Sequence, residues 1–247
     1  MVTTQRSRRG GLFWAILGGL VLIAGIVAII VVPLAGQPSP TATPTPATTS
    51  ASGSPTPPGS AGGEGEFVDP SVTAQGWVPE PITTDPETYI RAALAAASTF
   101  DTTKSSRDDW LTYLDTWFTP DTRYASEADQ QAAMAASQVE LRQGVVLPQE
   151  EWDSLAAEDG RVVAVVTGDL VFVPVTEDPS GDMSIGTGDI TLTNTRSDGG
   201  DGETSYEENV RVSVQVLCGE GSVPTPNTAQ QAGDCKVVRY FTEPLEP

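Results

Sequence analysis

The chain has 247 residues, of which 33 are acidic, 13 are basic and none is histidine, and its formal net charge is −20. A chain this acidic offers no basic face for direct nucleic-acid binding. The lack of histidine excludes histidine-based acid–base catalysis and a Ser-His-Asp triad.

The N-terminus predicts a membrane anchor. Residues 1–10 hold Arg6, Arg8 and Arg9 and no acid, and an uncharged apolar run follows over residues 11–36. A helix of this length can cross a hydrocarbon core of about 30 Å. The arginines predict a cytoplasmic N-terminus and an exported remainder. A cleaved signal peptide is the alternative, but its apolar region would be shorter, at about 7–15 residues.

Small residues four positions apart, Gly11, Ala15 and Gly19, form a stripe along this predicted helix. Such a stripe allows two membrane helices to approach closely, and hence allows a homo-oligomer. Glycine and alanine are also common in any membrane helix, so composition alone is the other interpretation.

Residues 37–66 predict a disordered linker, because they are rich in proline, threonine and serine and poor in apolar side chains. The Pro-Thr pattern favours extended polyproline II, at about 3.1 Å per residue. We therefore expect a stalk that carries a domain away from the membrane, and its hydroxyls could carry sugars.

Residues 67–247 predict one extracytoplasmic domain. All 33 acids lie beyond the apolar run, with the thirteen bases less the three N-terminal arginines, which gives this part a net charge of about −23. Solubility explains such a charge, and a basic protein partner is the functional alternative.

Helices are predicted first. Thr84 and Glu87 make a capping box for a helix within residues 83–100, with Pro86 in its first turn. A second helix, within residues 105–120, begins with Ser106 and Asp109 and is ended by Pro120, and a weaker third begins with Ser126 and Asp129. Residues 148–155 add a helical turn. Aromatic side chains predicted to lie in the core or to line a pocket are Trp110, Trp117, Phe118 and Phe172.

Strands follow. Residues 161–175 are β-branched and apolar, residues 182–196 predict a strand or a bent hairpin, and residues 197–203 predict a turn. Residues 210–217 and 236–241 predict the last two strands. Helices followed by antiparallel strands indicate an α+β domain, with the helices packed on one face of a curved antiparallel sheet.

Cys218 and Cys235 are the chain's only cysteines. Their spacing does not fit a zinc or C-x-x-C redox site, which leaves a disulfide or two unrelated buried thiols. Because both are predicted outside the membrane, where disulfides persist, we expect a bridge across the mouth of a hairpin.

A family resemblance lies in residues 87–124, "ETYIRAALAAASTFDTTKSSRDDWLTYLDTWFTPDTRY", and extends loosely to "VVRYF" at residues 237–241. With the anchor and stalk, this order resembles the TcpC-like bitopic assembly components of conjugation and type IV secretion, of an actinobacterial type. The resemblance implies a cystatin-like, SnoaL-like cone fold and a non-enzymatic scaffold in the cell membrane that binds other envelope proteins of a transfer machine. Only one cone domain fits this length, and the disulfide loop matches no family signature. Small anchored partners of Mce lipid-import systems have a similar plan, so an accessory lipid- or ligand-binding protein is the alternative.

No catalytic residue, metal site or cofactor is predicted. Neighbouring acids point apart on a strand or helix and favour a solvated surface, and residues 198–203 lack the ligand ladder of a calcium loop. The acidic pairs are Asp108/Asp109, Glu150/Glu151 and Glu207/Glu208.

The anchor predicts a defined labelling pattern in intact cells. Because residue 4 is expected inside and residue 52 outside, Thr4→Cys should be shielded from an impermeant thiol reagent and Ser52→Cys should be labelled. The reverse pattern, or a mature chain beginning near Gln37, would contradict an uncleaved, inward-facing anchor.

Overall fold

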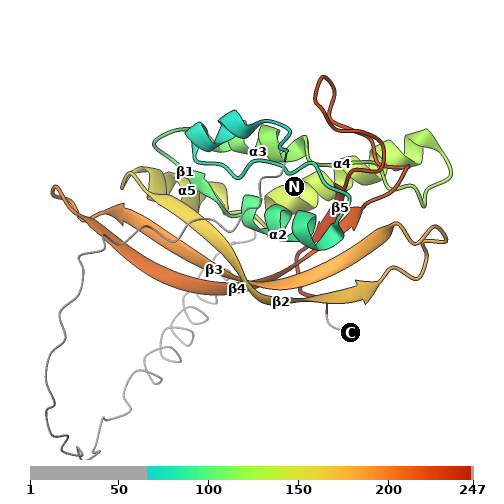
Figure 1. The fold of residues 1–247 in the computed structure, drawn as a ribbon. Coiled ribbons are helices and arrows are strands. Elements are labelled where there is room, and N and C mark those ends of the chain that lie inside the picture. Colours follow the sequence, from blue (N-terminus) through green and yellow to red (C-terminus); the bar gives the residue numbers. More distant parts are fainter. Residues whose placement is uncertain (1–65, 246–247) are drawn as a thin grey trace, which may run out of the picture. The chain divides into compact units, whose positions relative to one another are not determined.

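The computed structural model describes residues 66–245, so the predicted anchor with Gly11, Ala15 and Gly19, and nearly all of the linker, lie outside the described residues. The described part begins with helical elements and ends with strands, as the sequence predicts (Figure 1). The elements are η1 (Pro70–Gln75), α2 (Pro86–Ala96), β1 (Phe100–Asp101), α3 (Arg107–Asp115), α4 (Glu127–Gly144), α5 (Gln149–Ala156), β2 (Arg161–Pro174), β3 (Met183–Ser197), β4 (Glu203–Leu217) and β5 (Lys236–Phe241).

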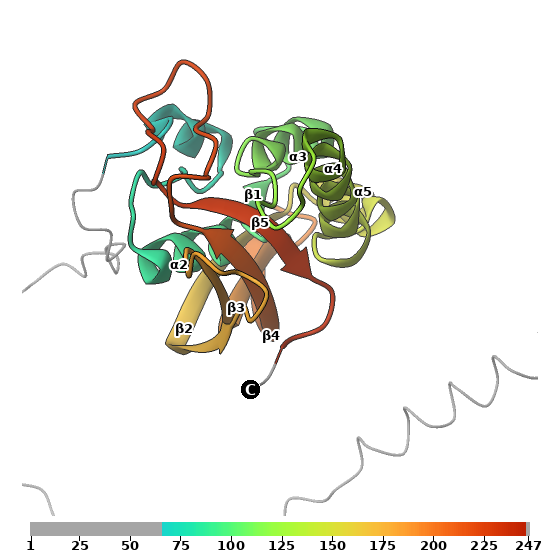
Figure 2. The ribbon, with the colours of Figure 1, turned by 90° about the vertical axis from the view of Figure 1, so that its right-hand side faces the viewer.

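The strands form one antiparallel sheet in the order β1-β2-β3-β4-β5. Figures 1 and 2 show a strongly curved sheet with the helices gathered on one face. The segment predicted as a strand or bent hairpin is the single strand β3, which pairs with β4 without interruption from Met183 to Ser197. The α+β prediction is therefore confirmed at the level of a curved sheet covered by helices.

Two glycines let α2 lie directly on the sheet. A Cβ at Gly186 of β3 would come within 2.9 Å of the Ile90 side chain, and one at Gly188 would come within 3.0 Å of Leu94. Ile90 and Leu94 are fully buried at these positions. The two glycines thus bring the helix into the concave face, where a larger side chain would hold it away.

Three aromatic rings form the centre of the core. Phe100 lies 4.9 Å from Trp110 and 4.3 Å from Trp152 between ring centroids, and the two tryptophans lie 5.6 Å apart. Trp117 and Phe118 are also buried, so these aromatic predictions hold as core residues.

Phe172 is a correction, because its side chain is 43% exposed. It lies in the half of β2 beyond a register shift between Thr167 and Val171. Within the described residues β2 pairs on its outer side only with the two residues of β1, opposite Arg161 and Val162. Phe172 therefore lies on a sheet edge that no other described strand covers, and its ring is partly exposed.

The predicted N-caps hold for two helices and fail for one. The hydroxyls of Ser106 and Ser126 accept hydrogen bonds from the backbone N–H groups three residues later, in α3 and α4. The capping box of Thr84 and Glu87 is wrong, because Asp85 caps α2 by accepting from Thr88. With Pro86 fixed as the first helical residue, the cap falls on the position directly before it.

The helix predicted up to Pro120 ends earlier, at Asp115. Thr116 and Trp117 form a turn, and the chain then pairs with the last strand: Val237 donates its N–H to Trp117 O at 2.9 Å, and Thr119 donates to Val237 O at 2.8 Å. The helix therefore ends well before Pro120, at a turn that leads into the pairing with β5. Residues 117–119 also cover the outer edge of β5 at its beginning.

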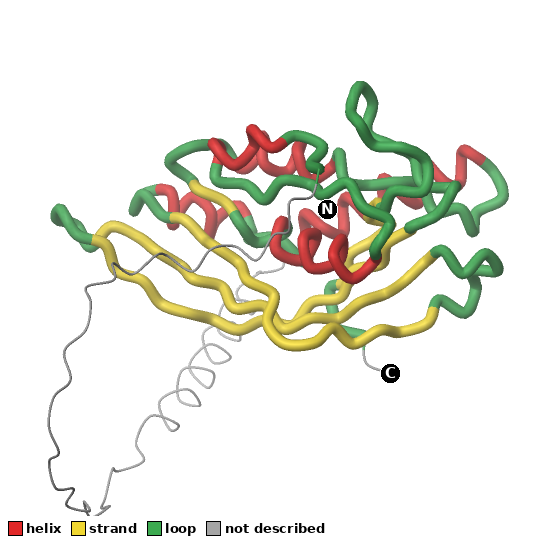
Figure 3. The backbone as a smooth tube through the Cα atoms, in the orientation of Figure 1, coloured by secondary structure: helices red, strands yellow, loops and turns green. Residues whose placement is uncertain are grey.

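A disulfide joins Cys218 and Cys235, directly beyond the paired ends of β4 and β5. Residues 219–234 between the two cysteines form a long loop without helix or strand, which Figure 3 draws in green. The predicted bridge across a hairpin mouth is what the structure contains.

We expect the oxidised chain to weigh two hydrogens less than the reduced chain, and Cys218→Ser/Cys235→Ser to lower the melting temperature. A bridge closing a loop of this length contributes about 3 kcal/mol, and each kcal/mol corresponds to roughly 2–4 °C in a domain of this size. Differential scanning calorimetry of the two forms measures the shift. Two free thiols in the native protein, counted under denaturing but non-reducing conditions, would contradict the bridge.

Candidate functional site

A group of buried polar side chains lies next to the disulfide, around Lys236, which directly follows Cys235. Glu80 and Lys236 are buried with exposures of 0% and 1%, and their charged ends are 2.8 Å apart, from Oε1 to Nζ. They are 156 residues apart in the sequence. The buried polar cluster, as we call it, consists of Glu80, Tyr89, Thr225, Gln230 and Lys236.

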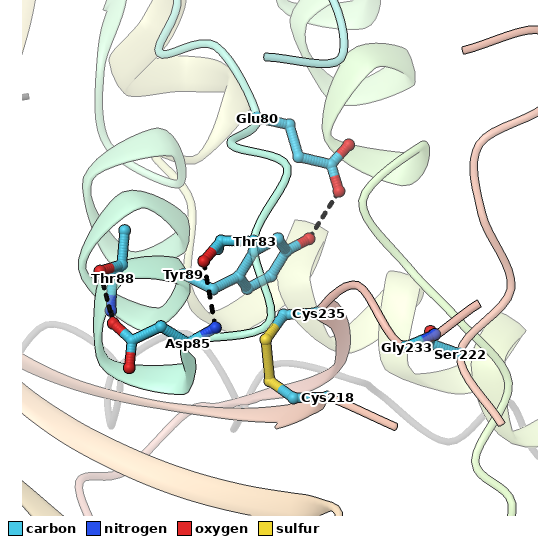
Figure 4. Close-up of a disulfide and its surroundings, with 9 residues drawn as sticks. All are labelled: Glu80, Thr83, Asp85, Thr88, Tyr89, Cys218, Ser222, Gly233 and Cys235. Atoms are coloured by element: carbon cyan, nitrogen blue, oxygen red, sulfur yellow. Dashed lines mark hydrogen bonds between the residues drawn. A yellow bond between two sulfur atoms is a disulfide. The ribbon is translucent and has the colours of Figure 1, made fainter. Parts of the chain in front are cut away.

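Glu80 accepts three hydrogen bonds on one carboxylate oxygen. Its Oε1 receives the Tyr89 hydroxyl at 2.6 Å, the Gln230 amide at 3.1 Å and the Lys236 ammonium at 2.8 Å. The other oxygen, Oε2, is buried and has no hydrogen-bond partner among residues 66–245. Figure 4 shows Tyr89 lying between Glu80 and the disulfide.

Lys236 reaches acceptors from separate parts of the chain. Besides Glu80, its Nζ donates to Thr116 O at 2.7 Å, just beyond α3, and to Thr225 Oγ1 at 2.8 Å, in the loop. A more distant contact joins it to Gln230 Oε1 at 3.4 Å. A buried ammonium is stable only when its donors are satisfied in this way.

Both backbone groups of Glu80, its N–H and its carbonyl, are hydrogen-bonded. Glu80 donates its own N–H to the Tyr113 hydroxyl at 3.0 Å, and its carbonyl accepts from Val68 at 2.9 Å. On the other side of the cluster, Cys235 donates its N–H to Thr83 O at 2.8 Å. The segment before α2 is thereby fixed to the last strand and the disulfide.

Burial shifts the proton affinities in the cluster. It lowers the pKa of Lys236, although the Glu80 carboxylate acts in the opposite direction. Burial raises the pKa of Tyr89 well above its usual value, and the neighbouring charge of Glu80 adds to the shift. Both shifts follow from the cost of placing charge where water is excluded.

The loop of residues 219–234 is held both to the core and across its own base. Val223 donates its N–H to Thr119 Oγ1 at 2.9 Å, and Gly233 donates to Ser222 Oγ at 3.1 Å across the base of the loop. The Val223 side chain is nevertheless 53% exposed. Figures 1 and 2 show the loop projecting beyond the helices, so a held base presents an accessible tip.

A separate cleft of about 330 Å³ lies between the sheet and the connection from α4 to α5. Its walls are mainly apolar, and they include Asn194, whose buried amide nitrogen has no partner within the described part of the chain. The apolar residues that line it are Phe100, Val145, Val146, Leu147, Pro148, Val162, Leu192, Val210 and Val212.

The acidic pairs do not converge. All six side chains are exposed and lie on three separate elements, α3, α5 and β4. Within residues 66–245 there is also no group of three or more acids or cysteines that could hold a metal ion. No helix among these residues is long and apolar enough to span a membrane.

Sequence reasoning missed the buried polar cluster. Lys236 follows a cysteine at the start of a strand, and Glu80 lies between two prolines, in "VPEPIT". A charge at the start of an apolar strand and another within a proline-rich stretch are weak signals, since both positions are usually solvated. Nothing in the local patterns pairs the two residues.

No family model matches the chain, and no curated protein matches its sequence. Two solved structures are similar to it. One is an IcmL-like type IV secretion system protein of Legionella pneumophila, with 13% identity over 64% of this chain and 88% of that chain and a TM-score of 0.38. The other is CagV, a VirB8 homologue of Helicobacter pylori, with 15% identity over 60% of this chain and 89% of that chain and a TM-score of 0.33.

Because Glu80 and Lys236 are buried, removing the Glu80 charge should destabilise the fold far more than removing a charge on the surface. Glu80→Gln leaves the Lys236 ammonium without its counter-charge and should lower the free energy of unfolding by about 3–5 kcal/mol. Glu87→Gln removes the partner of Arg91 in a surface pair and should cost less than about 1 kcal/mol. Urea denaturation of the two variants measures both values.

A double variant separates the lost charge from lost packing. Lys236→Met added to Glu80→Gln removes the stranded ammonium and should recover part of the loss. Equal destabilisation by Glu80→Gln and Glu87→Gln would show that the cluster is not enclosed as described.

Proposed function

We propose that this protein is a non-enzymatic, membrane-anchored assembly component of a conjugative transfer or secretion machine. Its exported domain docks other envelope proteins, and it stands on the anchor and stalk predicted for residues 1–66. The two similar solved structures are type IV secretion proteins, but similarity at this level adds no argument. The proposal rests on the order of the predicted anchor, stalk and folded domain along the chain, and on the loop of residues 219–234.

The loop is the observation that carries a docking role. It is closed at its base by the disulfide and connected to the core through Thr225 and Gln230, and its tip stays exposed. A loop ordered before binding loses little entropy when a partner arrives, which favours affinity. A catalytic role would instead need reactive groups that converge on an open cleft.

The partner's chemistry follows from charge. The loop contains Glu220 and Asp234 and no base, and the exported part as a whole is strongly acidic. An acidic surface of this kind steers a partner with a basic face. We therefore expect a protein partner with basic side chains and an apolar spot opposite Val223.

An accessory lipid- or ligand-binding protein of a transport system is the second candidate. The apolar cleft at Asn194 favours it, because apolar walls with few polar groups are typical of small-molecule sites. Organic extraction of the purified full-length chain distinguishes the two: a bound lipid at unit stoichiometry supports the ligand-binding role, and its absence supports docking.

The docking proposal predicts that the exposed side chain of Val223 in the loop matters and the acidic pairs do not. Val223→Asn should reduce transfer or secretion strongly, because it removes an exposed apolar contact without disturbing the core. Val139→Asn, at a similar exposure on α4, is the matched control and should have little effect. Transfer frequency in cells carrying each variant at the native locus measures both.

Deletion of residues 67–247 should abolish assembly, and the anchor and stalk alone should not restore it. Single substitutions in the acidic pairs should each leave transfer nearly unchanged, since solvated acids contribute little individually. If one of those substitutions eliminated function in a folded, correctly located protein, the docking role would be wrong.

A further inference from the structure

The buried polar cluster contains a nucleophile, an amide and a proton carrier within contact distance. Lys236 Nζ lies 3.4 Å from the carbonyl oxygen of the Gln230 side chain and 2.8 Å from Glu80 Oε1. Gln230 is 7% exposed and the other two are fully enclosed. An amine beside an amide in a site closed to water is an arrangement that can form a new amide bond.

The Gln230 amide is polarised at both ends. Its oxygen accepts the Thr225 backbone N–H at 2.9 Å, so a fixed donor faces the atom that gains negative charge when the carbonyl carbon is attacked. Its nitrogen donates to Glu80 Oε1 at 3.1 Å. The carboxyl group therefore lies next to the atom that must be protonated before it can leave.

Lys236 meets the requirements of an amine nucleophile. Burial lowers its pKa, which increases the share of the neutral amine. Glu80 is in position to take the proton. Its second oxygen, Oε2, is buried without a partner in the described part of the chain and is free to carry it.

We propose that Lys236 and Gln230 form an intramolecular isopeptide bond, with Glu80 as the proton carrier. The Lys236 ammonium passes a proton to Glu80, and the neutral Nζ attacks Cδ of Gln230. The Nζ–Cδ bond forms and the Cδ–Nε2 bond breaks. Of the two protons that Nζ loses, one completes the departing ammonia, and the other stays on Glu80, so that no buried carboxylate is left without a counter-charge.

The product keeps good hydrogen bonding. The new amide retains one N–H on the former Nζ, and Thr116 O at 2.7 Å is placed to accept it. The amide oxygen keeps its bond from the Thr225 N–H. Since no charged ammonium remains, the new bond also removes a buried positive charge from the interior.

The bond would be a second covalent crosslink at the base of the loop, with a chemistry different from that of the disulfide. The disulfide joins residues 218 and 235, and the isopeptide would join the adjacent Lys236 to a point inside the loop. A reductant opens a disulfide but leaves an amide intact. The loop would then keep part of its closed base under reducing conditions, which is a property independent of its docking partner.

The test is the mass of the purified full-length chain after reduction and alkylation. We expect it to be one ammonia lighter than the sequence requires. Trypsin should fail to cleave after Lys236 and should release residues 212–239 as one peptide, without fragment ions from between Gln230 and Lys236. An intact mass that matches the sequence, with normal cleavage at Lys236, overturns the proposal.

Amine labelling gives an independent readout, because the chain has only two lysines, Lys104 and Lys236. In the denatured wild-type chain a lysine acylating reagent should modify Lys104 and leave Lys236 unmodified. Full labelling of both side chains would overturn the bond, and this measurement requires no variant to fold.

Variants test the assigned roles. Glu80→Gln and Lys236→Arg should each restore the missing ammonia to the mass, and Lys104→Arg, the matched control at an exposed lysine, should leave the loss unchanged. An ammonia loss that persists in Lys236→Arg, or that maps to an asparagine, would overturn the assignment. A loss that persists in Glu80→Gln would overturn the role of Glu80.

Discussion

The chain must enclose Glu80 and Lys236 as a charged pair before any bond between Lys236 and Gln230 can form, and this pair is the constraint on which the arrangement of the domain depends. Two charges out of water are tolerated only when nearly every donor and acceptor around them is used. The polar groups that meet this demand come from the segment before α2, from α2 itself, from the residue after α3 and from the loop before β5. Segments that lie far apart in the chain are therefore held in one register, and a shift of any of them would strand a charge.

The loop of residues 219–234 is ordered because two of its side chains bind this pair. The disulfide alone fixes the two ends of the loop, whereas Thr225 and Gln230 fix points within it. What remains exposed is a tip of defined shape on an acidic domain. In the docking role that we propose, such a tip would act through shape and charge, on a domain whose acidic pairs are all exposed.

The curved sheet supplies the frame. Gly186 and Gly188 bring α2 into its concave face, and residues 117–119 cover the beginning of β5. Most of β2 is an edge that no other strand of residues 66–245 pairs with. Helices that fill one side of a bent sheet leave a gap where the packing is incomplete, and the cleft at Asn194 occupies that gap. The same geometry thus accounts for the buried core, for the exposed ring of Phe172 and for the cleft on which the second candidate function rests.

The sequence by itself determined the features that local chemistry fixes. Serine caps begin α3 and α4, alternating β-branched residues form the long strands, and two cysteines at the ends of neighbouring strands form a bridge. The helix end at Asp115, the cap at Asp85 and the exposure of Phe172 were decided by neighbours that a local pattern does not contain. The pairing of Glu80 with Lys236 is the clearest case. Each residue taken alone predicts a solvated charge, and only the folded chain removes water from both at once and makes each the necessary partner of the other.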